Sequence, residues 1–516
     1  MTGLSVAADK VAGMGRIAVI GAGMGAMAAA ARLAVAGHRV VVYERTETYG
    51  GAVRRFERDG FSFDTGPGLL PVPAVYRDLF IKTGKEPLED LVELVQVDPS
   101  SRHVFADGTE VSLPNASRAG VVTALDEALG GGAGQRWGDF LIRAREAWDR
   151  TRRPLLEEPL WTDWSVLAEQ EPYPAVPHKK LLRTRRASTL DEIGAWELRD
   201  ERLTALLESH ALAYGLHPRT APASAAVLPY MEHAFGTWYV RGGIRELARA
   251  VYERCLARRV EFVFGAEVTR VLEKDGRAAG VELADGNVVD ADHVVADVDP
   301  ARLRDLTERP LDGDGDVRAD PDSPLPVRFT LLLALRGPRE AGAVHRTVVH
   351  APDREAELDF LASPGGDEPR CPTVTVLRPE DPALTPDGEH ESVVVSAVLS
   401  SEAGWEDEGT VRRYTDFLLD AAGHAVPGLR ERLLWHEVRT PGDTESETGA
   451  RFGAVPAPSL AAGRGRFLHP ANTTRLPGLY RVGGWSHPGG GLPHAGMSGA
   501  LVAGLIVEGP EFRGSQ

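Results

Sequence analysis

The feature that most constrains the fold is a glycine-rich turn between an apolar strand and an alanine-rich helix. Residues 17–20 are all apolar, as in a buried strand, and the next six residues read Gly21-Ala22-Gly23-Met24-Gly25-Ala26. This turn fits the pattern G-x-G-x-x-A, whose glycines permit a tight turn and bring backbone amides close to a diphosphate at the start of a helix. The sequence therefore predicts a dinucleotide-binding turn.

The residues that follow complete a strand–helix–strand unit. Residues 26–36 are rich in alanine and end at Gly37, a residue suited to helix C-termini, and residues 39–43 form an apolar β-branched run. Glu44 follows that run, where a carboxylate accepts hydrogen bonds from a ribose and repels the 2′-phosphate of NADP. The unit therefore favours NAD or FAD as the dinucleotide.

Glycine turns elsewhere predict a mixed α/β protein with further strands. The pairs Asp275-Gly276 and Asp285-Gly286 separate apolar stretches and predict a meander of antiparallel strands. The pair Asp107-Gly108 predicts another hairpin in a separate region. These strands, together with the strand–helix–strand unit, are not compatible with a helix bundle.

Composition narrows the classes of function. The chain has 516 residues and a formal net charge of -17, which repels a phosphate backbone, so nucleic acid is not an expected partner. Two cysteines, Cys255 and Cys371, lie far apart, and no His/Cys/Asp cluster has metal-ligand spacing, so neither disulfides nor a metal site are expected. The start of the chain lacks the pattern of a signal peptide, which favours a cytoplasmic protein. Residues 482–507 carry no charged side chain but contain prolines and many glycines, which predicts a loop and a short helix rather than a membrane span.

One basic stretch lies within residues 121–250, a region whose pattern predicts helices. Basic and apolar residues alternate there between 178 and 186. One interpretation is a solvated helix face, and the other is a patch that contacts an anionic membrane surface. The second interpretation would rest on Lys179, Lys180, Arg183 and Arg186.

Three segments together resemble the phytoene desaturase family of flavoproteins, which is related to the monoamine oxidases. The first runs from Glu44 through Gly50-Gly51 to the stretch 61–68, which ends in Asp64-Thr65-Gly66-Pro67-Gly68. The second is residues 236–243 and the third is the glycine-rich segment 478–493. Because these segments lie near both ends and in the middle, the resemblance covers most of the chain.

The resemblance implies FAD as the cofactor and a Rossmann-like domain of the glutathione reductase or amine oxidase type. That domain is expected from residues 16–77, 236–305 and 470–508, interleaved with a substrate domain of mixed sheet and helices from 78–235 and 306–469. The backbone of Val268 is expected to meet the adenine, and Gly66 and Pro67 to lie near the isoalloxazine ring. The full set of expected FAD contacts is Gly21, Ala22, Gly23, Met24, Gly25, Ala26, Glu44, Arg45, Gly50, Gly51, Arg54, Gly66, Pro67, Gly68, Val268, Gly483, Gly484, Pro488, Gly489, Gly490, Leu492 and Pro493.

Two positions depart from the family pattern. Ala52 follows the glycine pair where many relatives have arginine, and Trp485 stands where distant flavoproteins have an acid on the ribityl chain. Arg54 could replace the missing arginine, although its spacing differs. Independently of the family, Gly483 and Gly484 permit a close approach of backbone to cofactor, and a helix starting near His494 would direct its positive end at a flavin anion.

The resemblance also implies a reaction. A C–H bond beside a polyene is expected to give hydride to flavin N5 while a proton leaves to a base or to solvent, so that a double bond forms in a long apolar substrate. His487 is the candidate for the proton transfer, although a histidine that structures its loop is an equal possibility. Oxygen or a quinone would reoxidise the flavin. Family members also isomerise or saturate polyenes, and some form carbocyclic rings from polyene tetramates. A non-catalytic prenyl-lipid carrier is an alternative of another class.

Overall fold

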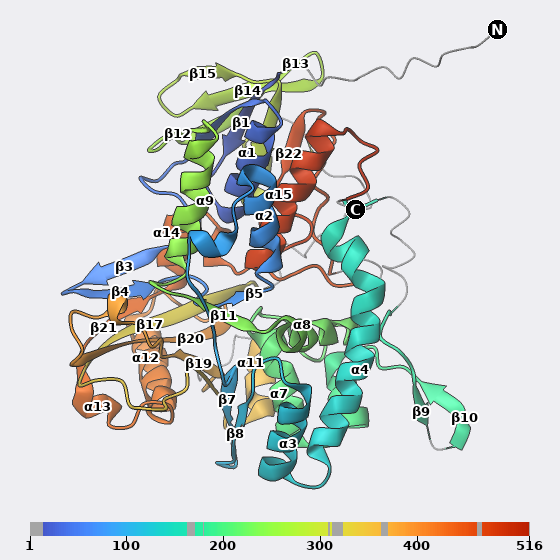
Figure 1. Ribbon diagram of the computed structural model, residues 1–516, viewed down its shortest axis with the longest axis vertical. Helices are drawn as coiled ribbons and strands as arrows, with labels where there is room; N and C mark the ends of the chain where they lie inside the picture. The colour runs from blue at the N-terminus through green and yellow to red at the C-terminus, as the bar shows by residue number, and fades with distance from the viewer. Residues whose placement is uncertain are drawn as a thin grey trace.

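Two β-sheets organise the molecule into an upper and a lower half in the view of Figure 1. The computed structural model describes residues 14–161, 171–178, 180–307, 310–311, 324–362, 370–461 and 467–514. The upper sheet is parallel and the lower one is mixed, so we name the two parts the parallel-sheet half and the mixed-sheet half. This arrangement agrees with the α/β fold expected from the sequence.

The parallel-sheet half contains the predicted strand–helix–strand unit. Its sheet has the strand order β12-β2-β1-β16-β22, and every neighbouring pair is parallel. Almost all of α1 is buried, because its small alanine side chains let α9 and α15 pack closely against it. The elements are β1 (Arg16–Ile20), α1 (Met24–Val35), β2 (Arg39–Tyr43), α9 (Arg245–Ala257), β12 (Glu261–Val263), β16 (His293–Ala296), β22 (Leu479–Arg481) and α15 (Leu492–Val507).

A three-stranded antiparallel sheet extends the parallel-sheet half at the top of Figure 1. Both predicted turns, Asp275-Gly276 and Asp285-Gly286, connect its strands as expected. The sheet consists of β13 (Val268–Lys274), β14 (Arg277–Leu283) and β15 (Val288–Asp290), after which β16 and the short α10 (Pro300–Asp305) follow.

The mixed-sheet half is built on a seven-stranded sheet with the order β21-β17-β20-β19-β18-β7-β8. The hairpin predicted at Asp107-Gly108 is β7–β8, and it forms one edge of this sheet. α12 packs against β19 and β20. The elements are β7 (Ser101–Val104), β8 (Glu110–Leu113), β17 (Pro326–Arg336), β18 (Arg346–Val349), α11 (Arg354–Ala362), β19 (Val374–Leu377), β20 (His390–Ser400), α12 (Glu408–Gly423), α13 (Leu429–Arg432) and β21 (Leu433–Arg439).

Helices cover one end of the mixed-sheet half, as the pattern of residues 121–250 predicts. They are α3 (Arg118–Leu129), α4 (Ala133–Arg152), α6 (Leu190–Ile193), α7 (Glu201–Leu212) and α8 (Val227–Phe235), and they enclose an apolar cluster of their own. Short elements run between the two halves: the hairpin β3 (Arg55–Arg58) and β4 (Phe61–Asp64), the small sheet of β5 (Leu70–Pro71), β6 (Leu94–Gln96) and β11 (Thr237–Val240), and the helix α14 (Pro441–Thr448). The helix α2 (Ala74–Gly84) packs against α1, α9 and α15 in the parallel-sheet half.

The basic stretch is not a helix face, and that interpretation is wrong. β9 (Val176–His178) and β10 (Lys180–Arg185) form an antiparallel hairpin that projects from the helical end in Figure 1. Basic and apolar residues alternate here with the period of a strand, which is two residues. Arg183 and Arg186 are exposed, whereas Lys179 lies outside the described residues.

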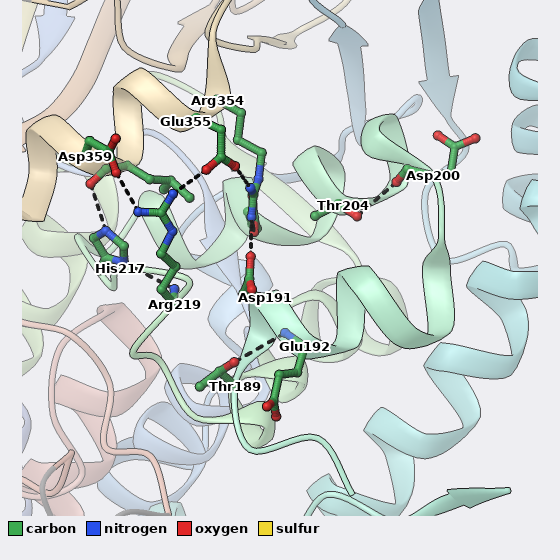
Figure 2. A network of polar contacts seen from close by, with 12 residues as sticks. Thr189, Asp191, Glu192, Asp200, Thr204, His217, Arg219, Arg354, Glu355 and Asp359 are labelled. Carbon is green, nitrogen blue, oxygen red and sulfur yellow. Dashed lines mark hydrogen bonds and ion pairs between the residues drawn. The ribbon is translucent and has the colours of Figure 1, made fainter. Parts of the chain in front are cut away.

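An ion-pair network holds the helices to α11 of the mixed-sheet half (Figure 2). Arg354 donates to the buried Glu208 at 2.6 and 2.7 Å and to Asp191 at 2.6 Å. Arg219 pairs with Asp359 at 2.6 Å and with Glu355. Because a buried carboxylate is costly unless it is paired, Arg354 is central to this contact.

The uncharged segment near the C-terminus divides into a loop and α15, as its glycines and prolines predict. Among the described residues, no helix is both long enough and apolar enough to cross a membrane.

Candidate cofactor-binding site

The glycine turn lies at the carboxyl ends of the parallel strands, where open α/β sheets bind ligands. Gly21 has φ of 89°, which favours glycine, and its amide donates to the Tyr43 carbonyl at 2.8 Å. The predicted glycine pair lies against this turn. The Gly50 amide donates to the Ala22 carbonyl at 2.7 Å, and a Cβ atom added at Gly51 would lie 3.1 Å from the Gly23 Cα. The structure therefore brings together two motifs that the sequence identifies separately.

Glu44 is buried beside the turn and is held by three donors. Its Oε2 accepts from the Ala22 amide at 2.8 Å, and its Oε1 accepts from the Thr46 amide at 2.9 Å and the Thr46 hydroxyl at 2.8 Å. A carboxylate has about four lone-pair positions, so capacity remains for ribose hydroxyls. The Ala266 amide donates to the Glu44 carbonyl at 2.9 Å, which places the segment before Val268 alongside this site.

Arg45 and Arg54 contact the C-terminal end of α14. Arg45 donates to the carbonyls of Glu445 and Ser446, and Arg54 donates to the Glu447 carbonyl at 2.8 Å. A cation is favourable at a helix C-terminus because the last carbonyls there lack partners in the helix. Arg54 also donates to the Gly51 carbonyl at 2.9 Å, so it holds the glycine pair in place. Direct contacts of both arginines with FAD stay predictions.

The closing loop, residues 482–491 between β22 and α15, reaches the glycine turn through Gly483. A Cβ atom added at Gly25 would lie 2.6 Å from the Gly483 Cα, so the backbones can meet only with glycine at position 25. Other glycines of the loop pack against the chain itself, since a Cβ atom on Gly490 would overlap the Pro456 carbonyl and one on Gly484 would lie 3.0 Å from the Pro456 Cγ. α15 begins at Leu492, earlier than expected, because proline is favoured in the first turn of a helix.

The remaining residues of this loop are also in place. Pro488 follows a cis peptide bond and is buried, and a Cβ atom added at Gly489 would lie 2.7 Å from the Ala457 carbonyl. Leu492 and Pro493 are buried at the start of α15. Packing against the chain therefore explains part of the glycine content that the sequence attributes to FAD.

The stretch that ends at Gly68 connects the site to the mixed-sheet half. A Cβ atom on Gly66 would overlap the Ala52 carbonyl, and one on Gly68 would lie 2.6 Å from Leu377 Cδ1 on β19. Pro67 between them is exposed. Asp64 accepts from the Ile244 amide at 2.8 Å at the start of α9. Burial raises the pKa of Asp64 to about 6, although its hydrogen bonds to backbone amides oppose that shift.

His487 is buried and bound by backbone groups. Its amide donates to the Pro470 carbonyl at 2.8 Å, and its Nε2 lies 2.9 Å from the Glu158 carbonyl, which can only accept. Burial lowers the pKa of His487 to about 4, so the imidazole is neutral at pH 7. These contacts give His487 a role in fixing the loop, and its part in catalysis stays a prediction.

Asp297 is the main site residue that sequence reasoning missed. It directly follows β16, its carboxylate lies between the glycine turn and Gly483, and its Oδ2 accepts from the Ala26 amide at 3.1 Å. In the sequence, the only indication of its role was that Asp297 ends an apolar run within the predicted meander. That signal was lost because nothing in the sequence shows that β16 joins the parallel sheet.

Arg245 was missed as well, although it holds the glycine-pair loop. Its guanidinium donates to the Val53 carbonyl at 2.8 Å and the Thr48 hydroxyl at 2.6 Å, and it stacks 3.9 Å from the centre of the Tyr49 ring. The arginine lies in the first turn of α9, about two hundred residues away in sequence, so no local pattern identifies it.

The residues present fit the adenosine diphosphate part of FAD. Amides at the start of α1 can bind the diphosphate and Glu44 can bind the ribose, although the Asp297 carboxylate lies against Gly23 and already accepts from the Ala26 amide. Gly483 and α15 then carry the site toward the mixed-sheet half, where a reactive ring would lie.

Known proteins are similar to this chain over nearly its whole length. A hydroxyneurosporene desaturase of Cereibacter sphaeroides is 30% identical, over 95% of this chain and 97% of its own. A 4,4′-diapolycopene oxygenase of a Methylomonas species is 29% identical, over 95% of this chain and 98% of its own. Among solved structures, putrescine oxidase bound to putrescine matches with a TM-score of 0.65 at 14% identity, and the match covers 96% of this chain and 99% of that one.

These similarities confirm the predicted fold class and FAD as the cofactor. The model of one family matches residues 27–507, which begin just after the glycine turn and include Glu44, the glycine pair and the closing loop. The chain therefore belongs to the family of flavin-containing amine oxidoreductases.

Proposed function

We propose that this protein is an FAD-dependent dehydrogenase that introduces carbon–carbon double bonds into a long apolar polyene. The observation that carries the proposal is the similarity to hydroxyneurosporene desaturase, which extends over nearly the full length of both chains. FAD supplies a hydride acceptor when it is bound. The glycine turn, Glu44 and the closing loop would fix the cofactor, and α15 would present its positive N-terminal end to the ring.

His487 and His494, near the closing loop, are candidates to accept the proton that leaves the substrate. Burial lowers the pKa of both His487 and His494 to about 4. His494 lies in the first turn of α15, and a Cβ atom added at Gly491 would lie 3.3 Å from its Nδ1 and 3.6 Å from the Tyr214 hydroxyl. Tyr214 follows α7, so this contact joins the loop to the helices of the mixed-sheet half. We therefore add His494 to His487 as a candidate base.

The domain boundaries are also a proposal. The strands of the parallel sheet all fall within residues 16–77, 236–305 and 470–508, the segments assigned to the FAD domain. The strands of the seven-stranded sheet fall within residues 78–235 and 306–469. Polyene binding is assigned to the second set.

The test combines flavin spectroscopy with product analysis. Purified protein is expected to be yellow, and under anaerobic conditions hydroxyneurosporene or a related acyclic carotene should bleach its flavin absorbance. The product should lack two hydrogen atoms for each new double bond, whereas added oxygen would indicate an oxygenase like the Methylomonas relative. Bleaching by a polyene tetramate but by no carotene would refute the carotene proposal. A colourless protein that binds prenyl chains without redox change would refute the enzymatic one.

We also propose that the β9–β10 hairpin contacts an anionic membrane surface at the inner face of the membrane. Its support is the projection of the hairpin from the body, the exposed Arg183 on β10 and the exposed Arg186 directly after it. Flotation with vesicles that contain phosphatidylserine tests this. Replacing both arginines with glutamine should reduce binding, while the control variant with Lys82→Gln on α2 and Lys85→Gln directly after it should bind like the parent. Equal binding of all three proteins would rule out the hairpin as the contact.

A further inference from the structure

The carboxylate of Asp297 lies between Gly23 of the glycine turn and Gly483 of the closing loop. A Cβ atom added at Gly23 would overlap Asp297 Oδ2, and one added at Gly483 would overlap Oδ1. Asp297 Oδ2 also accepts from the Ala26 amide at 3.1 Å. Glycines on two separate segments are therefore required by the presence of this one side chain.

This position coincides with the space reserved for a diphosphate. In the pattern G-x-G-x-x-A, the second glycine lacks a side chain so that a diphosphate can approach the backbone, and here that glycine is Gly23. Amides in the first turn of the helix are the groups that bind the phosphates, yet the Ala26 amide already donates to Asp297. A carboxylate and a diphosphate with two negative charges therefore compete for the same amides.

The groups that face Asp297 do not compensate its charge. Glu44 at the end of β2 adds a like charge, and Tyr76 of α2 contributes a neutral phenol that donates to the Leu492 carbonyl at 2.9 Å. The first turn of α1 offers backbone amides, and Gly483 of the closing loop has no side chain. Among the described residues, Asp297 has no ion-pair partner. Burial raises its pKa to about 7, the Ala26 amide opposes this, and Glu44 adds to it.

We propose that Asp297 couples the binding of FAD to pH, holding the cofactor when it is protonated and releasing it when it is ionised. Binding then takes up one proton from solvent, and the neutral carboxyl group donates its O–H to a phosphate oxygen. Ionisation removes that donor and places a third negative charge beside the two of the diphosphate. FAD affinity is therefore lost as pH rises through the titration of Asp297.

Equilibrium ultrafiltration of the holoenzyme between pH 6 and 9 tests the proposal without using activity. Free FAD in the filtrate should give a dissociation constant that rises about tenfold per pH unit above the pKa of about 7, or roughly 90-fold from pH 6 to pH 9. Asp297→Asn keeps a neutral hydrogen-bonding side chain, so its constant should change less than about threefold over the same range. Asp290→Asn removes a carboxylate from the exposed β15 strand and should retain the parent slope.

A parent dissociation constant independent of pH would overturn the proposal, as would an unchanged slope in Asp297→Asn. Weaker binding of that variant at every pH would also overturn it, because the carboxylate would then be a favourable FAD contact. If the variant does not fold, displacement of FAD from the parent decides. Adenosine, which lacks phosphate, should displace FAD at lower concentrations as pH rises, whereas ADP-ribose should need the same concentration throughout. A constant requirement for both ligands would refute the coupling.

Discussion

The two halves of the molecule are held together by different means. In the parallel-sheet half, α1, α15 and the closing loop approach so closely that backbone atoms meet, as at Gly25 and Gly483. In the mixed-sheet half, β17 is buried along most of its eleven residues, and side-chain ion pairs such as Arg354 with Glu208 hold the helices. Added atoms are therefore costly where the backbones of the first half meet, and the loss of a charged partner is costly where the helices join the second half. Adding a methyl group should therefore damage the parallel-sheet half, and removing a charged side chain should damage the mixed-sheet half, each without affecting the other.

The largest expected effect is on the mixed-sheet half. Arg354→Ala leaves Glu208 buried without its cation, and the loss of one partner from a buried pair costs about 3 kcal/mol. Denaturant unfolding followed by tryptophan fluorescence should show this loss, while the ratio of FAD to protein stays at the parent value. Arg354→Lys is the control and should lose less. Loss of FAD together with stability would show that the halves do not respond separately.

Gly25→Ala should have the converse effect. The added methyl group would lie 2.6 Å from the Gly483 Cα and 2.8 Å from its amide nitrogen, and such overpacking costs about 2 kcal/mol. We expect FAD affinity to fall about 30-fold, because the cost of about 2 kcal/mol arises at the contact between the glycine turn and the closing loop. Gly388→Ala is the control, because a Cβ atom there would meet nothing within 4 Å. If Gly25→Ala retains FAD like the control, close backbone contact does not limit the site.

Asp64 tests the connection between the halves through its pH dependence. Its pKa is raised from 3.8 to about 6 in the folded protein, so folding favours the protonated form, and its contribution to stability falls as pH rises between these values. Asp64→Asn should therefore gain about 2 kcal/mol relative to the parent when the pH changes from 4 to 7. Urea unfolding of both proteins at the two pH values measures this difference. A constant difference would contradict the buried, raised pKa.

The smallest expected effect concerns His487. Its contacts with the Pro470 and Glu158 carbonyls favour a role in the loop, so His487→Ala should change the rate of single-turnover flavin reduction by less than about twofold. The melting temperature should fall, because a buried side chain is removed. His494→Ala is the comparison, and a slower reduction in that variant alone would assign the proton transfer to His494. A slow rate in His487→Ala would restore the original hypothesis.

Features encoded by consecutive residues could be predicted from the sequence. The strand–helix–strand unit and the turns at Asp275-Gly276 and Asp107-Gly108 depend on local backbone preferences. The interpretation of the basic stretch as a helix face was wrong because a short alternation of basic and apolar residues fits a helix face as well as the β9–β10 hairpin.

Long-range placement could not be predicted. β7 pairs in parallel with β18, which is more than two hundred residues further along the chain, and no local signal specifies that register. Asp297 and Arg245 reach the site for the same reason, through the packing of β16 and α9. An acid at a strand end is informative only once the sheet order is known.

The contact between Gly25 and Gly483 has a consequence for biosynthesis. The two residues lie far apart in the chain, so β22 and α15, which complete the parallel-sheet half, leave the ribosome long after the glycine turn. A nascent chain holds the glycine turn early but lacks the loop that closes over it. If the closing loop holds FAD as proposed, we expect the cofactor to be acquired after translation has passed α15, and translation products truncated before residue 479 should not retain it.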